Sequence, residues 1–399
     1  MKGAWSVAFI LKVAVVAAMV LTGSPGTRIV AAQSSMSDRI TVRGYLKFMQ
    51  TNLIESADSI LTDNLVHNRL SIRARLGKGF SAGVEARNRV FYGEIVKSIP
   101  GYGDLITSYD GVLDLEWLWV NTSDLVINTI VDRAWLNYGG DLFEARIGRQ
   151  RINWGYNPVW NPNDLFNAFD YLDFDYEERP GSDAVHGEYY LGDMSSIDVA
   201  YKWAAQSQNN VGAVRLQLNR WEYDMQFIIG RYQQDWAIGT GWAGVLGTAG
   251  FKGEATLFIP SSDAPEKAET TLSLTSSIEY GFKNGWNVLG SYLLNTGGAT
   301  DGGSLVSFLT FTPGAKNLMP NKHTVLVGAY RQFSPLFVAN MSVMYAFQVN
   351  TTILLPAISY SVRQNWDLDL IGQLYWGDGD SGSFENLGNG LYLRLRWSF

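Results

Sequence analysis

The chain has 399 residues, a formal net charge of −7 and no cysteine. These figures exclude a disulfide framework, a thiolate metal site and a cysteine-linked lipid, and they leave no basic surface for nucleic acid. Charged residues make up 17% of the chain and aromatic residues 13%, beside 41 glycines, whereas about a quarter of a typical soluble protein is charged. The composition therefore argues against an ordinary soluble protein.

The first 32 residues are typical of a secretory signal peptide. Lys2 supplies the positive start, an apolar run follows, and Val30-Ala31-Ala32 offers small residues before a predicted cleavage at Gln33. The alternative is a membrane anchor, which needs about 20 uninterrupted apolar residues, but Lys12 breaks this run. We expect one exported domain, residues 33–399.

From Arg39 onward, apolar and polar residues alternate with a period of two, which predicts β-strands with one apolar face. The pattern is cleanest in the last strand, where alternate leucines run up to Trp397 and Phe399. Eighteen candidate strands occur, at about 39–50, 65–77, 80–92, 127–139, 142–152, 184–191, 196–205, 208–219, 222–232, 235–247, 250–259, 269–281, 286–296, 321–332, 336–347, 351–362, 366–376 and 389–399.

The connections between these strands alternate in length. Every even-numbered connection is a short turn, such as Gly139-Gly140-Asp141, and every long one is odd-numbered: 51–64, 93–126, 153–183, 260–268, 297–320 and 377–388. This sorting predicts an all-β fold, a transmembrane antiparallel up-and-down β-barrel with short periplasmic turns and long extracellular loops. In lipid every backbone group must be paired, so the first and last strands must pair with each other.

The C-terminal strand, ending on Phe399, resembles the terminal strand of bacterial outer-membrane proteins. That resemblance implies insertion by the barrel-assembly machinery and a location in the outer membrane, in contact with its lipid and lipopolysaccharide.

The lumen of an eighteen-stranded barrel is too wide for side chains to fill, so inward residues are expected to set its selectivity. On the phase opposite to lipid the first five strands carry mostly bases, against Glu85, Glu144 and Asp132. We predict a basic pore wall, the alternative being a lumen that is simply polar. Its bases are Arg39, Arg43, Lys47, Arg69, Arg73, Arg75, Arg87, Arg89, Arg133 and Arg146.

Asp132 and Arg133 are neighbours, so both cannot point inward on a regular strand. An outward carboxylate in the membrane would be costly, and we therefore predict a β-bulge at this point.

The segment 153–183 is predicted to fold into the barrel as a constriction loop, because a loop of this length in a compact domain is usually functional. Its acids would face the basic wall across the opening. The alternatives are an acidic surface loop that binds divalent cations or nothing; Asp170, Asp173 and Asp175 lack the EF-hand spacing, and no metal site is predicted. The aromatic residues would either stack on sugar rings or pack the loop's own core. The predicted constriction residues are Trp154, Trp160, Asp164, Asp170, Asp173, Asp175, Glu177 and Glu178.

Residues 146–155 read R-I-G-R-Q-R-I-N-W-G, and Asn161-Pro162-Asn163-Asp164 follow. A G-R-Q strand end, W-G and a long loop with N-P and acids resemble the Gram-negative porin-like group that includes alginate-export channels and phosphate-selective porins. The resemblance implies a substrate channel. Arg149 and Arg151 depart from it, because they fall on the lipid phase, where they would either bind headgroup phosphates or be turned inward by a bulge.

The predicted function is a passive outer-membrane porin for small polar or anionic solutes, with no cofactor and no enzymatic activity. A homo-oligomer is left open. One alternative is a channel or surface-assembly protein that binds or exports oligosaccharide or polysaccharide. Another is an outer-membrane hydrolase, for which His67 and Ser71 are the best available pair. A TonB-dependent transporter would need a plug and more strands.

Overall fold

The computed structural model describes residues 39–56, 59–107, 110–175, 181–262, 264–265, 268–300, 311–378 and 383–399. The predicted signal peptide and the predicted loop residues Glu177 and Glu178 lie outside these ranges. The chain divides into two compact units, Met1–Thr41 and Val42–Phe399, and the barrel described below belongs to the second.

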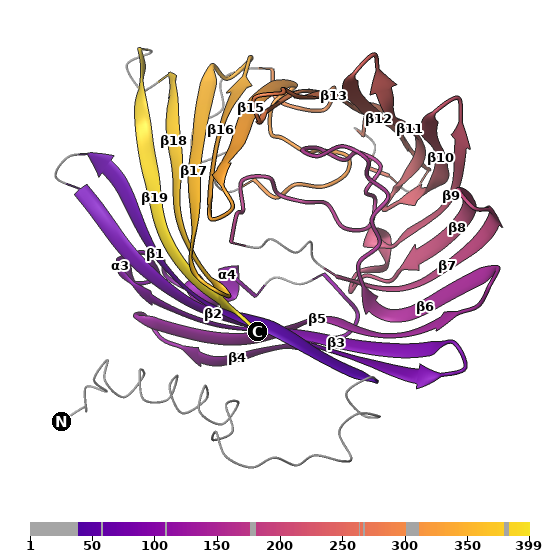
Figure 1. The fold of residues 1–399 in the computed structure, drawn as a ribbon, viewed down its shortest axis with the longest axis horizontal. Helices are drawn as coiled ribbons and strands as arrows, with labels where there is room; N and C mark the ends of the chain where they lie inside the picture. Colours follow the sequence, from indigo (N-terminus) through magenta and orange to yellow (C-terminus); the bar gives the residue numbers. More distant parts are fainter. Residues whose placement is uncertain are drawn as a thin grey trace. The chain divides into compact units, whose positions relative to one another are not determined.

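The described residues contain one antiparallel sheet of 19 strands that closes on itself (Figure 1). Closure is made by β1 and β19, which pair from Tyr45 opposite Ser398 to Ile54 opposite Asn389. The strands are β1 (Ile40–Ser56), β2 (Ser59–Gly77), β3 (Phe80–Gly93), β4 (Glu116–Asn121), β5 (Leu125–Gly139), β6 (Phe143–Gln150), β7 (Ser182–Gly192), β8 (Ser195–Lys202), β9 (Val211–Arg220), β10 (Tyr223–Tyr232), β11 (Asp235–Leu246), β12 (Ala249–Pro260), β13 (Thr271–Gly281), β14 (Trp286–Asn295), β15 (His323–Ser334), β16 (Phe337–Ala346), β17 (Thr351–Arg363), β18 (Trp366–Asp378) and β19 (Phe384–Ser398).

The predicted closed barrel of eighteen antiparallel strands is confirmed. Beside it stands the short strand β4, which was not predicted, inside the connection 93–126. The same connection holds two short helices, α3 (Glu94–Ser98) and α4 (Tyr102–Leu105), and a 3₁₀ turn, η1 (Ser207–Asn209), follows β8. In the described residues, no helix has the length and apolar character needed to cross a membrane.

Two connections predicted to be long loops are short. β1 continues to Ser56 and β2 already begins at Ser59, so most of 51–64 is strand; likewise β18 reaches Asp378 and β19 begins at Phe384. The prediction missed these strand ends because apolar and polar residues do not alternate there, as the consecutive Leu53 and Ile54 show.

Burial in the sheet is inverted relative to a soluble protein. On β2 the polar side chains of His67 and Arg69 are buried, while Ile72 on the opposite face is 40% exposed. On β12 and β13, Glu254 and Ser273 are fully buried. Apolar side chains outside and polar ones inside are what a wall between lipid and an aqueous lumen requires.

The predicted bulge at Asp132 is confirmed. Glu85 of β3 pairs with Arg133 and Ala86 pairs with Val131, so Asp132 is the extra residue on β5. The bulge lets Asp132 and Arg133 both be buried, at 3% and 6% exposure, without placing a carboxylate against lipid.

Candidate functional site

The candidate site begins where β6 ends. β4 pairs with residues 126–130 of β5, and β6 pairs with residues 134–139 on the same edge. Because β4 already occupies the outer half of that edge, the chain cannot continue along β5 after Gln150. It leaves the sheet there as a segment without regular structure.

Gly148 explains why the G-R-Q motif begins with glycine. Its φ is +112°, a conformation that side-chain-bearing residues rarely adopt. A Cβ at this position would also collide with the backbone carbonyl oxygen of Ala134. The unusual backbone breaks the alternation, so Arg149 and Gln150 are both buried at 1% exposure.

Of the two alternatives predicted for Arg149, the inward position is therefore the correct one, and the headgroup ligand is wrong. Its guanidinium donates to both carboxylate oxygens of Asp183, at 2.8 and 3.1 Å, and to the backbone carbonyls of Val131 and Leu113. Asp183 in turn accepts the backbone N–H of Leu113. The pair thus fastens the ends of β6 and β7 to the segment before β4. Arg151 is exposed.

Residues 151–175, called the inner loop below, lie inside the ring of strands (Figure 1). The loop touches distant parts of the wall in turn. Gln226 of β10 donates to the carbonyl of Trp154 at 2.7 Å, and Gln373 of β18 donates to the carbonyl of Leu172 at 2.6 Å. It ends against β1, where Lys47 lies 2.7 Å from Asp175.

Glu254 on β12 is the main anchor of the inner loop. Its carboxylate is fully buried and accepts the backbone N–H groups of Tyr156, Asn157 and Asn163 and the side-chain amide of Asn161. The distances to Asn157, Asn161 and Asn163 are 2.7, 3.2 and 3.1 Å. Sequence reasoning missed Glu254, because it occupies an ordinary inward position of a strand.

The large aromatic residues in the first half of the inner loop are buried against the barrel wall, Trp154 beside residues such as Ile228 and Trp160 beside residues such as Leu293. Trp154 and Trp160 are 2% and 1% exposed, and the ring of Trp154 meets that of Phe166 edge-on, 5.1 Å between centroids. Asp164 is fully buried. Trp154, Trp160 and Asp164 were predicted as constriction residues, but at this burial they hold the loop in shape instead of facing a solute.

The predicted basic wall is largely paired with acids. Asp132 accepts from Arg69 at 2.6 Å and from Arg87 at 2.9 Å, and Glu85 accepts from Arg69 and Arg73 at 2.8 and 2.9 Å. Buried guanidiniums require such partners. The tally of bases on the inward phase therefore overstated the charge that a solute would meet.

The other predicted bases divide by exposure. Arg133 is buried and donates to the carbonyl of Asp132. Arg89 donates to Asn128 and to the carbonyl of Ile106, the residue that follows α4. Arg146 is 30% exposed and lies over the ring of Trp135.

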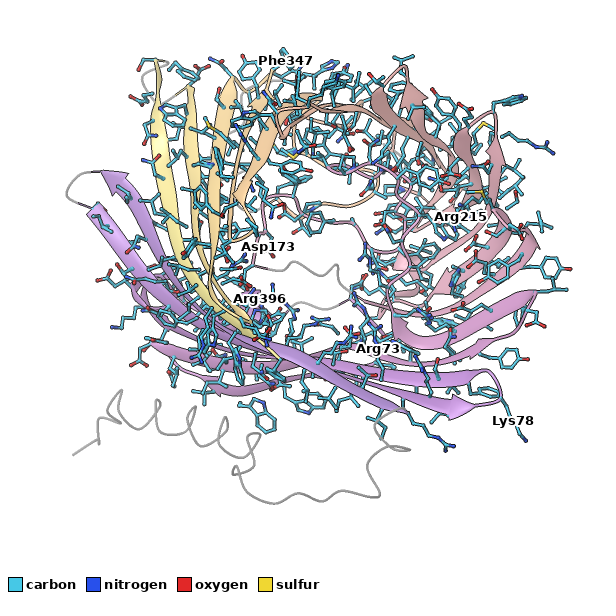
Figure 2. All side chains as sticks on the ribbon, viewed as in Figure 1. Arg73, Lys78, Asp173, Arg215, Phe347 and Arg396 are labelled. Carbon is cyan, nitrogen blue, oxygen red and sulfur yellow. The ribbon has the colours of Figure 1, made fainter. Side chains whose placement is uncertain are left out.

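Among the predicted bases, Arg39, Arg43, Arg73 and Arg75 are exposed, and the side chain of Arg73 is 64% exposed. Figure 2 shows Arg73 on the inner side of the ring and Lys78 at its outer margin. Arg43, Arg73 and Arg75 lie toward the short-turn end of the barrel, near the Gly77-Lys78-Gly79 turn.

Asp175 contacts the basic wall directly, so the prediction that the loop acids face this wall across the opening is wrong for this residue. Lys47 lies 2.7 Å and the Nδ1 of His67 lies 3.3 Å from its carboxylate. Burial by itself would raise the pKa of Asp175, but the hydrogen bond with His67 and the charge of Lys47 outweigh it and hold this pKa below the ordinary value. Asp175 therefore pins the far end of the described loop at neutral pH.

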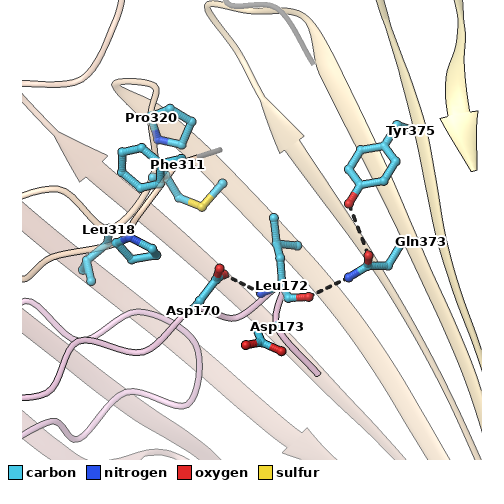
Figure 3. Close-up of a pocket in the computed structure, with 10 residues that line it drawn as sticks. Asp170, Leu172, Asp173, Phe311, Leu318, Pro320, Gln373 and Tyr375 are labelled. Atoms are coloured by element: carbon cyan, nitrogen blue, oxygen red, sulfur yellow. Dashed lines mark hydrogen bonds between the residues drawn. The ribbon is translucent and has the colours of Figure 1, made fainter. Parts of the chain in front are cut away.

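Three neighbouring cavities lie beside the inner loop, and Asp170 lines two of them. Their volumes are about 150, 260 and 410 Å³, and Asp173 borders all three. Figure 3 shows the smallest, where Asp170 accepts the backbone N–H of Leu172, while Gln373 joins Leu172 to Tyr375. Burial raises the pKa of Asp170.

Further lumen ion pairs were missed by the sequence reading. Asp198 accepts from His186 and Arg215, at 3.0 and 2.9 Å, and Arg394 donates to Asp369 at 2.9 Å. The sequence-based tally of inward charges covered the first five strands, and these pairs lie on later strands. Among the described residues, no group of three or more His, Asp or Glu side chains is arranged to hold a metal ion.

No protein-family model and no curated protein matches this chain. Solved structures do match. OccAB4 of Acinetobacter baumannii has a TM-score of 0.58 at 12% identity, covering 90% of this chain and 98% of that one. OccAB3 of the same organism has 0.57 at 10%, covering 90% and 99%. OccK11 (OpdR) of Pseudomonas aeruginosa has 0.55 at 11%, covering 91% and 97%.

These neighbours are outer-membrane porins. The barrel has the fold of an outer-membrane porin. At such low identity the similarity establishes the fold, and the solute has to be argued from the residues of this chain.

Proposed function

We propose that this protein is a passive channel for small polar solutes in the bacterial outer membrane, with a modest preference for anions. The observation that carries the proposal is the inner loop, which is hydrogen-bonded to opposite parts of a closed barrel wall. A loop held in this way narrows the lumen, and the cavities beside it, about 150 to 410 Å³, are the size of small organic solutes.

The anion preference follows from which charges are accessible. Glu85 and Asp132 are bonded to arginines, whereas Arg43 and Arg75 stand exposed at the short-turn end. Arg73 donates to Glu85, but its side chain is still 64% exposed. Low-dielectric walls focus the field of such charges into the lumen. Because most of the wall is neutralised, the preference is weaker than the sequence tally suggested.

Planar-bilayer recording under a salt gradient tests this proposal. The purified barrel should conduct, and its reversal potential should favour chloride over potassium. Replacing Arg73 and Arg75 together by Gln should move the reversal potential toward zero, because both guanidiniums face the lumen. Replacing Lys78 and Lys283 together by Gln, which removes two positive charges from the exposed turns between β2 and β3 and between β13 and β14, is the matched control and should change nothing. A barrel that never conducts, or one that prefers potassium, contradicts the proposal.

The hydrolase alternative is not favoured by the geometry. His67 is bonded through Nδ1 to Asp175. Ser71 lies four residues along the same strand, a separation of about 13 Å, which is too far for a base to activate a nucleophile. A polysaccharide-binding protein that does not conduct would differ in liposome swelling, since graded sugars would then fail to enter.

We also propose the following for the chain as a whole. Residues 1–32 would direct export and be removed. The outer face of the barrel would contact outer-membrane lipid and lipopolysaccharide. The barrel-assembly machinery would recognise the terminal strand. The position of Phe399 supports this, because its side chain is 39% exposed and its backbone exchanges both hydrogen bonds with Gly44, where the first and last strands pair. A homo-oligomer stays a prediction.

A further inference from the structure

The largest of the three cavities beside the inner loop, about 410 Å³, has two chemically different sides. The loop forms one side with residues 169–174, and strands β16 to β19 form the other. The cavity lies apart from the arginines that the proposed anion preference uses.

The loop side of the cavity is aromatic. Phe169, Tyr171 and Phe174 line it. The ring of Phe174 stands edge-on against Tyr392 of β19, 4.3 Å between centroids, which fixes its orientation. Ser342 of β16 lines the cavity beside Tyr171. Unlike Trp154 and Trp160, these rings border open space.

The wall side of the cavity mixes apolar residues, such as Leu355 and Ile371, with polar ones. Arg394 donates to Asp369 at 2.9 Å, and Ser359 donates to the same carboxylate at 2.5 Å. Asn340 adds an amide. Amides and hydroxyls can donate and accept at once, so this side suits a ligand that carries several hydroxyl groups.

The pairing between two wall strands is also interrupted at this point. Pairing between β17 and β18 stops at Leu354 opposite Leu374 and resumes at Ala357 opposite Ile371. Pro356, which has no N–H to donate, stands in the gap opposite Gly372. Proline is rare inside a sheet, and here Pro356 and Gly372 both line the cavity.

We propose that this cavity binds a neutral sugar of one or two rings. The apolar C–H face of the sugar would rest on Phe169, Tyr171 and Phe174, and its hydroxyls would reach Asn340, Ser359 and the Asp369–Arg394 pair. An anionic ligand would be repelled by the carboxylate of Asp173, which also lines the cavity. The site depends on the proposed channel function, because a sugar would reach it through the lumen.

Calorimetric titration of the detergent-solubilised barrel with maltose tests the site independently of conduction. Maltose should bind the unaltered protein. Phe174→Ala and Asn340→Ala should each raise Kd by about tenfold or more, since each removes a ring face or a hydrogen-bonding group. Phe347→Ala, which removes an exposed aromatic ring after β16, is the matched control and should leave Kd unchanged.

Choline and succinate are the comparison ligands in the same titration. No heat with maltose, or maltose binding that survives both cavity variants, overturns the sugar site. Binding of choline in place of maltose would assign the cavity to an organic cation and overturn it as well. Bilayer recording separates the two proposals: a conducting barrel that ignores maltose refutes the site alone, whereas a barrel that binds maltose without conducting refutes the channel.

Discussion

Replacing Glu254 by Ala should release the inner loop from the barrel wall. The carboxylate is the acceptor for four N–H groups of the loop, three of them from the backbone of Tyr156, Asn157 and Asn163. In the variant these buried donors lose their acceptor. Each lost acceptor costs about 1 kcal/mol, the lower end of the usual range, because water can enter the vacated space. For four donors, the docked loop is destabilised by about 4 kcal/mol.

A loss of about 4 kcal/mol shifts the balance between docked and released loop roughly a thousandfold. The barrel itself should remain, since its closure between β1 and β19 does not involve Glu254. Single-channel recording should therefore show larger and flickering currents, and a protease added to the detergent-solubilised barrel should cut within residues 151–175. Retention of the barrel is checked by its migration on gels before and after boiling.

The matched control for this experiment is Glu279→Ala. Glu279 lies on the neighbouring strand β13 and pairs with Lys252 at 3.1 Å, away from the inner loop. It should conduct and resist protease like the unaltered protein. If Glu254→Ala were as quiet and as protease-resistant as this control, the assignment of Glu254 as the loop anchor would be refuted.

Three further predictions concern the loop and its wall. The pKa of Asp175 is depressed, so its contact with Lys47 is present above the ordinary aspartate pKa of about 3.9 and is lost only as pH falls through the lower folded value. The current noise of the unaltered channel should therefore stay constant from pH 7 to 4, whereas the Asp175→Asn variant should be noisy throughout. Equal noise in the two proteins would contradict this. Gly148→Ala forces a positive φ and a collision with Ala134, which should cost roughly 2 kcal/mol and lower the thermal unfolding temperature; an unchanged temperature would argue against the strain. Asp132→Ala leaves two buried guanidiniums without their shared acceptor and should destabilise the barrel by about 3–5 kcal/mol in urea unfolding, a result that a barrel of unaltered urea midpoint would exclude.

The alternation of residues and the sorting of loop lengths were enough to predict the barrel. Both are local properties, since a strand with one face to lipid and one to water shows its period in its own residues. The bulge at Asp132 was predictable for the same reason, because a carboxylate next to an inward arginine had no tolerable outward place. The accessible arginines near the Gly77-Lys78-Gly79 turn also followed from strand phase.

Tertiary structure decided what the inner loop does. No periodic pattern marks β4, and its position on the outer half of β5 is what ends β6 and sends the chain into the lumen. Glu254 reads as one more inward acid until the fold brings it to the backbone of Asn157, far away in sequence. Trp154 and Phe174 are alike as aromatic loop residues, yet one packs the loop and the other borders a cavity. Each of these outcomes depends on which distant segment lies opposite, and a residue's own neighbours in the chain carry no record of that.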